Sequence, residues 1–236
     1  SDKGFGTEQI EESLKDLFPD FVTKRMDYDT TRGKNAHQQI IADFEQGRTD
    51  VLVGTQMVTK GLDFDNVALV GILNADSMLY FPDFRAYERA FQLMIQVAGR
   101  AGRKGEQGKV LIQTYDKEHE IFGLLKANDY LPFIKKQIEE RKLFNYPPYN
   151  RLIGITLKHK NQRKLDVASQ ALVGLMRKSF GNRVLGPEYP AISRIRNYYH
   201  KNVLLKIEQE GSVVKAKNIL QTIVGRMQEH TDFKAI

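Results

Sequence analysis

The chain has 236 residues, of which 41% are hydrophobic and 28% charged. It is therefore long enough for one large domain or two small ones, each with its own core. No apolar run approaches the roughly 18 residues that cross a bilayer, and the first residues lack the features of a signal peptide. Cysteine is absent, which excludes disulfides and thiolate metal sites, and the histidines lack metal-ligand spacing. We expect a cytoplasmic, metal-free chain that does not contact a membrane.

The net charge of +7 is unevenly distributed along the chain. Residues 150–236 contain 16 Lys and Arg against 6 Asp and Glu, a net charge of +10, whereas residues 1–149 have a net charge of −3. This asymmetry indicates a polyanionic partner for the last third of the chain, with nucleic acid as the favoured class. A basic but merely solvated surface is the alternative.

The first part of the chain alternates helices and strands. Helices are expected over residues 8–18 (with Thr7 as N-cap), 36–46, 84–98, 118–128 and 129–142. Strands are expected over residues 21–27, 50–54, 67–73 and 109–114. Strands that are apolar on both faces and separated by helices indicate an α/β fold with a parallel sheet covered on both sides.

A second, smaller domain is predicted after Tyr146-Pro147-Pro148-Tyr149, which ends the last of these helices and forms an extended connector. Strands are expected over residues 151–158, 183–185, 202–208 and 232–236, and helices over 162–180 and 213–228. This βαββαβ order predicts a ferredoxin-like α+β domain. The predicted domains are therefore residues 1–128, a linker over 129–150, and residues 151–236.

The segment Gln96-Val-Ala-Gly99-Arg100-Ala-Gly102-Arg103 follows a helix that is expected to lie against the sheet. Its glycines allow close backbone turns, and its two arginines stand three positions apart. A guanidinium is always charged and offers paired donors, which suits a phosphoryl group that gains negative charge. The alternative is a Gly-Arg turn on a solvated surface.

A second segment, residues 54–64, directly follows the strand expected over 50–54. It places a hydroxyl group, a cation, a glycine and a carboxylate near the carboxyl end of that strand: Thr55, Lys60, Gly61 and Asp63. Ligands bind at this edge of open α/β sheets. An ordinary strand-to-helix loop is the alternative, but two such segments in order argue against coincidence.

Together the two segments resemble motifs V and VI of superfamily 2 helicases. Further segments resemble one family of that superfamily, the bacterial primosomal replication-restart helicases (the PriA family). These segments are Gly6-Thr7-Glu8, Asp27 to Thr31, Pro82 to Ala86, the Tyr-Pro-Pro-Tyr connector and Val184-Leu-Gly-Pro187. The resemblance covers nearly the whole chain, although Leu62 and Asp65 depart from the family's motif V.

The resemblance implies that residues 1–128 form a second RecA-like helicase lobe and that residues 151–236 bind DNA. The intact protein would be an ATP-dependent 3′–5′ DNA helicase that recognises stalled or recombined replication forks and restarts replication by primosome assembly. Arg100 and Arg103 would act as arginine fingers, with Gln96 coupling phosphate contacts to lobe closure. Gly61, Asp63 and Gly99 would lie at the nucleotide cleft, while Thr55 and Lys60 would face the single-stranded DNA.

The resemblance also implies cofactors and partners. ATP and Mg²⁺ would be bound mainly by another lobe, because the chain has no GxxxxGK[ST] P-loop. We therefore expect the chain alone to lack ATPase activity. The leading part of the lobe and the family's cysteine-rich zinc region are expected to lie outside it. The implied partners are single-stranded and forked DNA, single-stranded DNA-binding protein and other primosomal proteins.

The basic last third contains the segment Arg194-Ile-Arg196-Asn-Tyr198-Tyr199-His200-Lys201. Cations that alternate with aromatic rings can neutralise phosphates while bases stack, and each stacked base contributes roughly 1–3 kcal/mol. Predicted DNA contacts are therefore Arg194, Arg196, Tyr198, Tyr199 and Lys201. The alternative is a strand edge whose tyrosines belong to the core. A second cluster of Lys158, Lys160, Arg163 and Lys164 is interpreted as a solvated helix start, with a DNA contact as the alternative.

Two other functions stay open at this point. The chain could be a binding module for fork DNA without chemistry of its own. It could also bind RNA, because small basic ferredoxin-like domains serve RNA as well.

Overall fold

The computed structural model describes residues 6–55, 58, 66–99, 101–103, 106–229 and 233. Its packing divides the chain into two compact units, Ser1–Phe133 (unit 1) and Ile134–Ile236 (unit 2). The division falls within helix α6 (Tyr130–Leu143). No helix in the described part of the chain is both long and apolar enough to cross a membrane.

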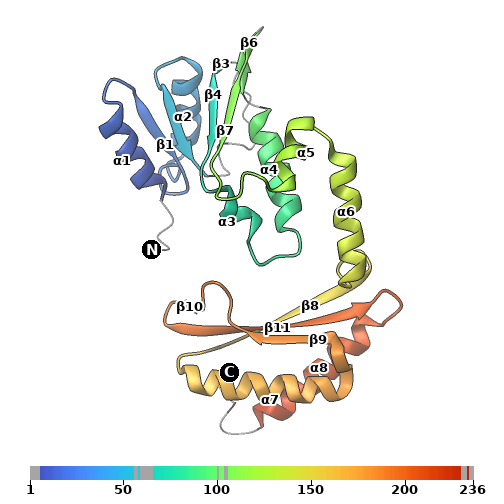
Figure 1. Ribbon diagram of the computed structural model, residues 1–236. Coiled ribbons are helices and arrows are strands. Elements are labelled where there is room, and N and C mark those ends of the chain that lie inside the picture. The colour runs from blue at the N-terminus through green and yellow to red at the C-terminus, as the bar shows by residue number, and fades with distance from the viewer. Residues whose placement is uncertain are drawn as a thin grey trace. The chain divides into compact units, whose positions relative to one another are not determined.

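Unit 1 is an α/β unit built on two pairs of parallel strands (Figure 1). Strand β1 (Thr23–Met26) pairs with β2 (Val51–Gly54), and β4 (Leu69–Ile72) pairs with β7 (Lys109–Ile112). Three two-residue strands form a small antiparallel sheet: β3 (Asn66–Val67), β5 (Gly102–Arg103) and β6 (Glu106–Gln107). The helices are α1 (Thr7–Leu17), α2 (Ala36–Glu45), α3 (Ala75–Leu79), α4 (Ala86–Ala98) and α5 (Glu120–Ala127). The predicted parallel α/β architecture is thus confirmed.

Two hydrophobic clusters hold unit 1 together. In the larger one, α3, α4 and α5 pack with the start of α6, and the rings of Phe91 and Phe133 stack with centroids 4.4 Å apart. The smaller one is centred on Met26 and Val67, with Leu52 of β2 and Val70 of β4 packed against it. Because this second cluster contains residues of both parallel pairs, side-chain packing joins the two pairs.

Three features of unit 1 differ from the sequence-based expectations. Thr7 was expected to cap the first helix, but Gly6 is the N-cap, and the Thr7 hydroxyl instead donates to Asp27, 20 residues away. Helix α3 was not expected; the side chain of Asn74 starts it by accepting the backbone N–H of Ser77. The strand expected over residues 67–73 is divided into β3 and β4, which pair with different partners.

A buried carboxylate, Asp43, links α2 to the neighbouring strand and turn. It accepts hydrogen bonds from Lys24 of β1, from the amide of Gln39 at 2.9 Å and from Arg48 Nε at 2.9 Å. The Lys24 hydrogen bond, followed by those from Arg48 and Gln39, holds the pKa of Asp43 well below its usual range. The hydrogen bonds to charged Asp43 therefore stabilise the folded state.

We expect Asp43→Asn to make unit 1 less stable and less sensitive to acid. Since the folded-state pKa of Asp43 is depressed, its stabilisation is fully present above the unfolded pKa of about 3.9 and is lost as pH falls toward the folded value. Urea unfolding between pH 6 and pH 3 should show a shallower loss of stability on acidification in this variant. Asp16→Asn, on the exposed surface of α1, is the control. Equal pH slopes in Asp43→Asn and the unmodified chain would contradict this assignment.

Unit 2 has an antiparallel sheet with two long helices on one face (Figure 1). Its central strand β11 (Tyr198–Glu208) pairs with β8 (Asn150–His159) on one side. On its other side β11 pairs with β9 (Val184–Glu188) and β10 (Arg194–Ile195). The helices are α7 (Gln162–Phe180) and α8 (Val213–Gln228), and a 3-10 turn, η2 (Gly181–Arg183), precedes β9.

The topology of unit 2 is the predicted split βαβ plan, because β11 lies between β8 and β9, which α7 connects. The core is formed by the inward side chains of β11, such as Val203 and Leu205, with Leu172 and Met176 of α7 and Leu220 of α8. Two expectations need correction. Strand β11 begins four residues earlier than expected, and β10, which pairs with this extension, was not foreseen. The strand expected over residues 232–236 lies outside the described residues except for Phe233.

Lys201 belongs to a polar network at the start of α7. It is 7% exposed, and its amino group lies 2.7 Å from a carboxylate oxygen of Asp166. The hydroxyl of Tyr189 donates to the same carboxylate at 2.6 Å, and the Lys201 amino group lies 4.5 Å from the centre of the Tyr189 ring. The Lys201 and Tyr189 hydrogen bonds lower the pKa of Asp166. The network therefore joins β11, α7 and the loop after β9.

Because of this network, we expect Lys201→Met to make the folded state less stable. The variant keeps the apolar stem but leaves Asp166 without its ammonium partner, which should lower the free energy of unfolding by about 1–3 kcal/mol. This expected loss of stability is smaller than the loss for a fully buried ion pair, because the Asp166 side chain is 42% exposed. Thermal and urea unfolding measure the change, with Lys217→Met on the exposed surface of α8 as control. Unchanged stability together with weaker DNA binding would return Lys201 to the group of DNA contacts.

Candidate nucleotide-cleft segments and nucleic-acid interface

The first candidate segment leaves β2 at its carboxyl end. Gly54 ends the strand, and an added Cβ there would lie 2.6 Å from the backbone oxygen of Met26, so glycine allows β1 and β2 to approach closely. Thr55 follows and is exposed, and its carbonyl accepts the N–H of Val58 at 3.0 Å. The other predicted residues of this segment, Lys60, Gly61 and Asp63, lie outside the described residues.

The second candidate segment begins in the last turn of α4. Gln96 is exposed there, and Gly99 is the C-cap residue of the helix. Arg100 lies outside the described residues, and only the backbone of Arg103 is described. That backbone belongs to β5. In this strand Gly102 adopts φ +138°, a backbone conformation that residues other than glycine rarely adopt.

A backbone ladder joins the second segment to the strand that follows the first segment. Strand β3 comes directly after the first segment and pairs with β5 of the second, with Asn66 opposite Arg103 and Val67 opposite Gly102. Strand β6 pairs with the other side of β5. Gly108 completes this arrangement, because an added Cβ there would lie 2.2 Å from the backbone nitrogen of Gly102. The backbone of the second segment is thus held beside the strand that follows the first segment.

Two of the shorter family-like segments also meet in space. The carboxylate of Asp27 accepts the hydroxyl of Thr7 at 2.6 Å and the backbone N–H of Thr30 at 3.0 Å, while Arg25 Nε lies 3.2 Å from it. The Thr7 hydrogen bond is the main cause of a lowered pKa at Asp27. The contacts fix the turn after β1 against the start of α1.

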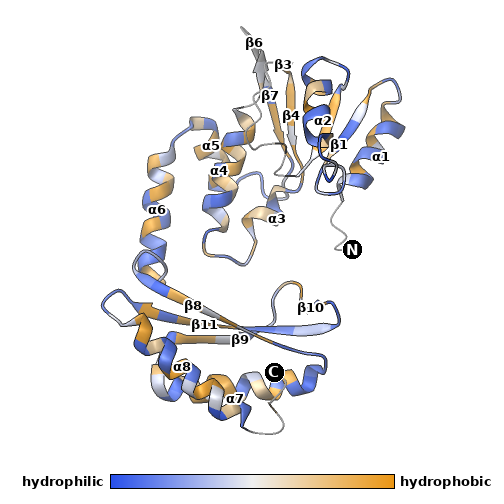
Figure 2. Cartoon of the chain, turned by 180° about the vertical axis from the view of Figure 1, so that it is seen from behind, coloured by the Kyte–Doolittle hydropathy of each residue, from blue (hydrophilic) through white to orange (hydrophobic). Residues whose placement is uncertain are grey.

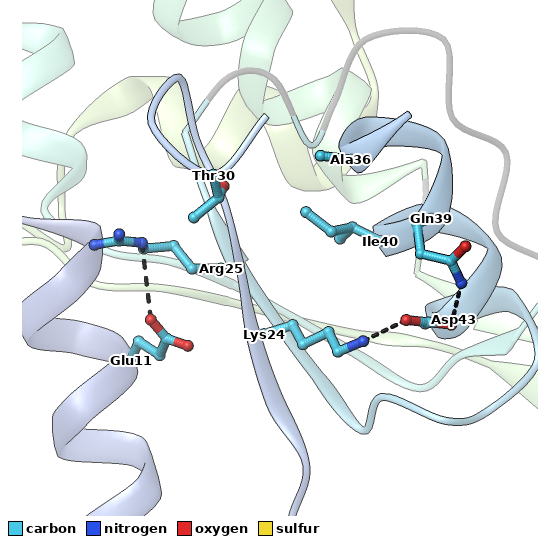
Figure 3. A pocket seen from close by; sticks show the side chains of 8 residues that line it. All are labelled: Glu11, Lys24, Arg25, Thr30, Ala36, Gln39, Ile40 and Asp43. Carbon is cyan, nitrogen blue, oxygen red and sulfur yellow. Dashed lines mark hydrogen bonds and ion pairs between the residues drawn. The ribbon is translucent and has the colours of Figure 1, made fainter. Parts of the chain in front are cut away.

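A surface pocket of about 380 Å³ lies between α1, β1 and α2 (Figure 3). Lys24 points from β1 toward Asp43 of α2, whereas Arg25 points toward Glu11 of α1, with Arg25 Nε 3.7 Å from the Glu11 carboxylate. The two cations are thus already paired with carboxylates of the pocket itself. We assign this pocket to packing, because an anionic ligand would have to displace those carboxylates. Among the described residues, no group of three or more His, Asp or Glu side chains is placed to hold a metal ion.

Unit 2 presents an exposed basic hairpin formed by β10 and β11. Arg194 pairs opposite Tyr199 and lies 5.2 Å from the centre of its ring. Arg196 and Asn197 form the tip with φ +47° and +69°, which are the left-handed values of a two-residue hairpin turn. Arg194, Arg196 and Tyr198 are exposed, so the described geometry leaves these predicted contact residues accessible.

The second basic cluster of the sequence joins this hairpin. Lys158 of β8 lies opposite His200 of β11, and the amino groups of Lys158 and Lys160 lie 5.7 and 5.6 Å from the centre of the Tyr198 ring. Both lysines are exposed, and no carboxylate of the described residues pairs with either of them. The two clusters are about 40 residues apart in sequence, so the sequence pattern alone does not show that the pairing of β8 with β11 unites them. Lys201, by contrast, is buried on the opposite face with Asp166.

Two family models match the chain, one after the other. The helicase conserved C-terminal domain matches residues 6–105, and the primosomal protein N C-terminal domain matches residues 142–233. Among solved structures, the C-terminal domain of the DEAD-box protein Dbp5 shows a TM-score of 0.34 and 23% identity, covering 50% of this chain and 60% of that one. At that score the likeness supports no conclusion.

Curated proteins named replication restart protein PriA are similar over most of the chain. The Bacillus subtilis (strain 168) protein is 41% identical over 209 residues, which are 88% of this chain and 26% of the relative. The protein of Synechocystis sp. is 42% identical over 205 residues, 86% of this chain and 25% of the relative. The Haemophilus influenzae protein is 38% identical over 215 residues, 90% of this chain and 30% of the relative. The chain thus spans between a quarter and a third of the length of these relatives.

The comparisons agree with the geometry described above. The helicase match contains both candidate segments and the pairing of β3 with β5, and the primosomal match contains the basic hairpin. These are the parts of the chain whose residues carried the resemblance. The chain belongs to the primosomal protein N (PriA) family of replication restart proteins.

Proposed function

We propose that this chain is the second motor lobe and the DNA-binding domain of an ATP-dependent 3′–5′ DNA helicase. The intact protein would recognise stalled or recombined replication forks and restart replication by primosome assembly, in the cytoplasm. The observation that carries the proposal is the pairing of β3 with β5, which ties the chain just after the first segment to the backbone of the second, the two segments that resemble motifs V and VI. The names of the relatives support the biological role.

In this proposal the candidate segments form one wall of a nucleotide cleft. Arg100 and Arg103 would reach the phosphates of ATP bound to another lobe and stabilise the charge that develops during transfer. Gln96 would couple that contact to lobe closure, and Gly61, Asp63 and Gly99 would line the cleft. The described exposure of Gln96 and Gly99, at the end of α4, fits such a wall.

DNA would be held at two places on the chain. Thr55 and Lys60 would contact the phosphates of the translocating single strand, and the exposed position of Thr55 at the carboxyl end of β2 supports this role. Arg194, Arg196 and Tyr198 would bind fork DNA in unit 2, whereas Tyr199 packs against the core and is not kept as a contact. We no longer propose Lys201 as a contact, because its amino group is buried against Asp166.

The remaining cofactors and partners follow from the family. ATP and Mg²⁺ would be bound mainly by the lobe that carries a P-loop, and zinc would belong to the family's cysteine-rich region. Forked and single-stranded DNA, single-stranded DNA-binding protein and other primosomal proteins are the proposed partners. A binding module without chemistry of its own describes the isolated chain equally well, since the motor needs both lobes.

The isolated chain should not hydrolyse ATP. A P-loop is required to hold the β- and γ-phosphates, and the sequence has none. Phosphate release measured with the purified chain, with and without single-stranded DNA, should stay at background. DNA-stimulated turnover that scales with the concentration of the chain and disappears in Arg100→Ala would refute this expectation.

The arginine-finger role is tested in a full-length relative. In the Bacillus subtilis protein, alanine at the position aligned with Arg100 should lower kcat for DNA-dependent ATP hydrolysis by at least about 100-fold, since a preorganised charge on the transferring group is lost. DNA affinity should stay within about twofold. Alanine at the position aligned with Lys15 is the control. Lys15 lies near the end of α1, which comes before the amino end of β1, whereas the candidate segment follows the carboxyl end of a strand. A loss of DNA binding that accounts for the whole loss of turnover would argue for a DNA contact instead.

DNA binding by the chain should be strongly salt-dependent and should depend on the hairpin of unit 2. Each phosphate contact adds about 0.7 to the slope of log K against log salt for a single strand. Arg194→Ala and Arg196→Ala should each reduce that slope by roughly this amount. Lys215→Ala makes the same change of charge at the start of α8, beyond the other end of β11, and should leave the slope unchanged. Equal effects of all three substitutions would point to diffuse attraction.

The same titrations separate DNA from RNA. Fork DNA and a structured RNA of equal length should compete for the chain, with the fork as the stronger competitor. A clear preference for the RNA would favour the RNA-binding alternative over the helicase assignment of unit 2.

A further inference from the structure

In the described part of unit 2, helices α7 and α8 lie on the same face of the sheet. Both α7 and α8 pack on the face that carries Val203, Leu205 and Ile207 of β11 (Figures 1 and 2). Side chains alternate along a strand, so the residues between these point the other way. No helix that follows β8 in the described residues covers that second face, which we call the helix-free face.

The register of the strands identifies which residues lie on the helix-free face at its basic end. Tyr198 and His200 alternate with the covered positions of β11, and Lys158 and Thr156 lie opposite His200 and Asn202 on β8. On β10, Ile195 lies opposite Tyr198. Ile195 is 47% and Tyr198 is 36% exposed, so an aromatic and an aliphatic side chain stand side by side in contact with water.

Cations surround the exposed ring of Tyr198. The amino groups of Lys158 and Lys160 lie within 6 Å of its centre, and Arg196 lies at the hairpin tip two residues before it. The nearest carboxylate of α7, Asp166, is engaged by Lys201 on the covered side of the sheet. An exposed ring with an aliphatic neighbour and free ammonium groups suits a nucleobase and its phosphates.

We propose that a single strand of nucleic acid lies across the helix-free face, with one base stacked on Tyr198 and the adjacent phosphates on Lys158 and Lys160. This proposal rests on the DNA-binding role proposed above for unit 2 and gives that role its location and strand preference. A duplex keeps its bases stacked on one another, so it cannot offer a base to Tyr198. The arginines of the hairpin contact phosphates of either form.

The test compares a single-stranded oligonucleotide with a duplex of the same length on the whole 236-residue chain, by fluorescence anisotropy at one salt concentration. Tyr198→Ala should weaken single-strand binding by roughly 5- to 100-fold and leave duplex binding within about twofold. Tyr198→Phe keeps the ring and should bind the single strand about as tightly as the unmodified chain does. Arg196→Ala should weaken both forms alike.

A second pair of variants tests the path of the strand. Thr156→Glu places a negative charge on the helix-free face, and Gln170→Glu places the same charge on the exposed surface of α7. The Thr156 variant should lose at least about fivefold more single-strand affinity, because its charge would face the phosphates directly. Circular dichroism and thermal unfolding show whether each variant keeps its fold.

Two outcomes would overturn the proposal. One is an equal loss of single-strand and duplex affinity in Tyr198→Ala. The other is an equal effect of the Thr156 and Gln170 substitutions. A chain that binds neither oligonucleotide would instead refute the DNA-binding role of unit 2 itself, so the two failures are distinguishable.

Discussion

The short ladder between β3 and β5 fixes the backbone on which the proposed motor role of unit 1 depends. It pairs the strand that follows the segment starting at Thr55 with the backbone of Gly102 and Arg103, which is far away in sequence. Gly108 permits the third strand to close against Gly102, where any larger residue would meet backbone atoms. A group that stabilises a developing charge must be placed before the reaction begins. In the proposed role, the paired backbone of β3 and β5 would supply this placement for Arg103.

Charge has different tasks in the two units. In unit 1, Lys24, Arg25 and Arg48 are paired with carboxylates of neighbouring elements, and their energy contributes to holding α1, β1 and α2 together. In unit 2, Lys158 and Lys160 lie beside an exposed ring without a carboxylate partner among the described residues. A cation that keeps its water and lacks a partner remains available to a phosphate. The asymmetry of charge along the sequence therefore corresponds to a difference in how the cations of the two units are paired.

Much of the fold could be predicted from the sequence, because hydrophobic periodicity and turn residues act over short distances. Helices α2, α7 and α8 and strands β2 and β7 lie close to where the pattern indicated. The features that could not be predicted depend on contacts between residues that are distant in sequence. Thr7 has the residue type of an N-cap but bonds Asp27, and the β3–β5 pairing involves strands too short to show periodicity. The roles of Arg100 and Asp63 stay predictions, because neither residue is described.

The basic hairpin shows why a motif alone does not identify contact residues. Its residues look equivalent in sequence, yet strand alternation sends Tyr198 and His200 to one face and Tyr199 and Lys201 to the other. The pairing of β11 with β8 and the core positions Val203 and Leu205 fix which face each of these residues occupies. A shift of β11 by one residue against β8 would exchange the faces and bring Lys201 to the helix-free face. The register of β11, rather than the composition of the motif, thus decides which side chains are exposed on that face.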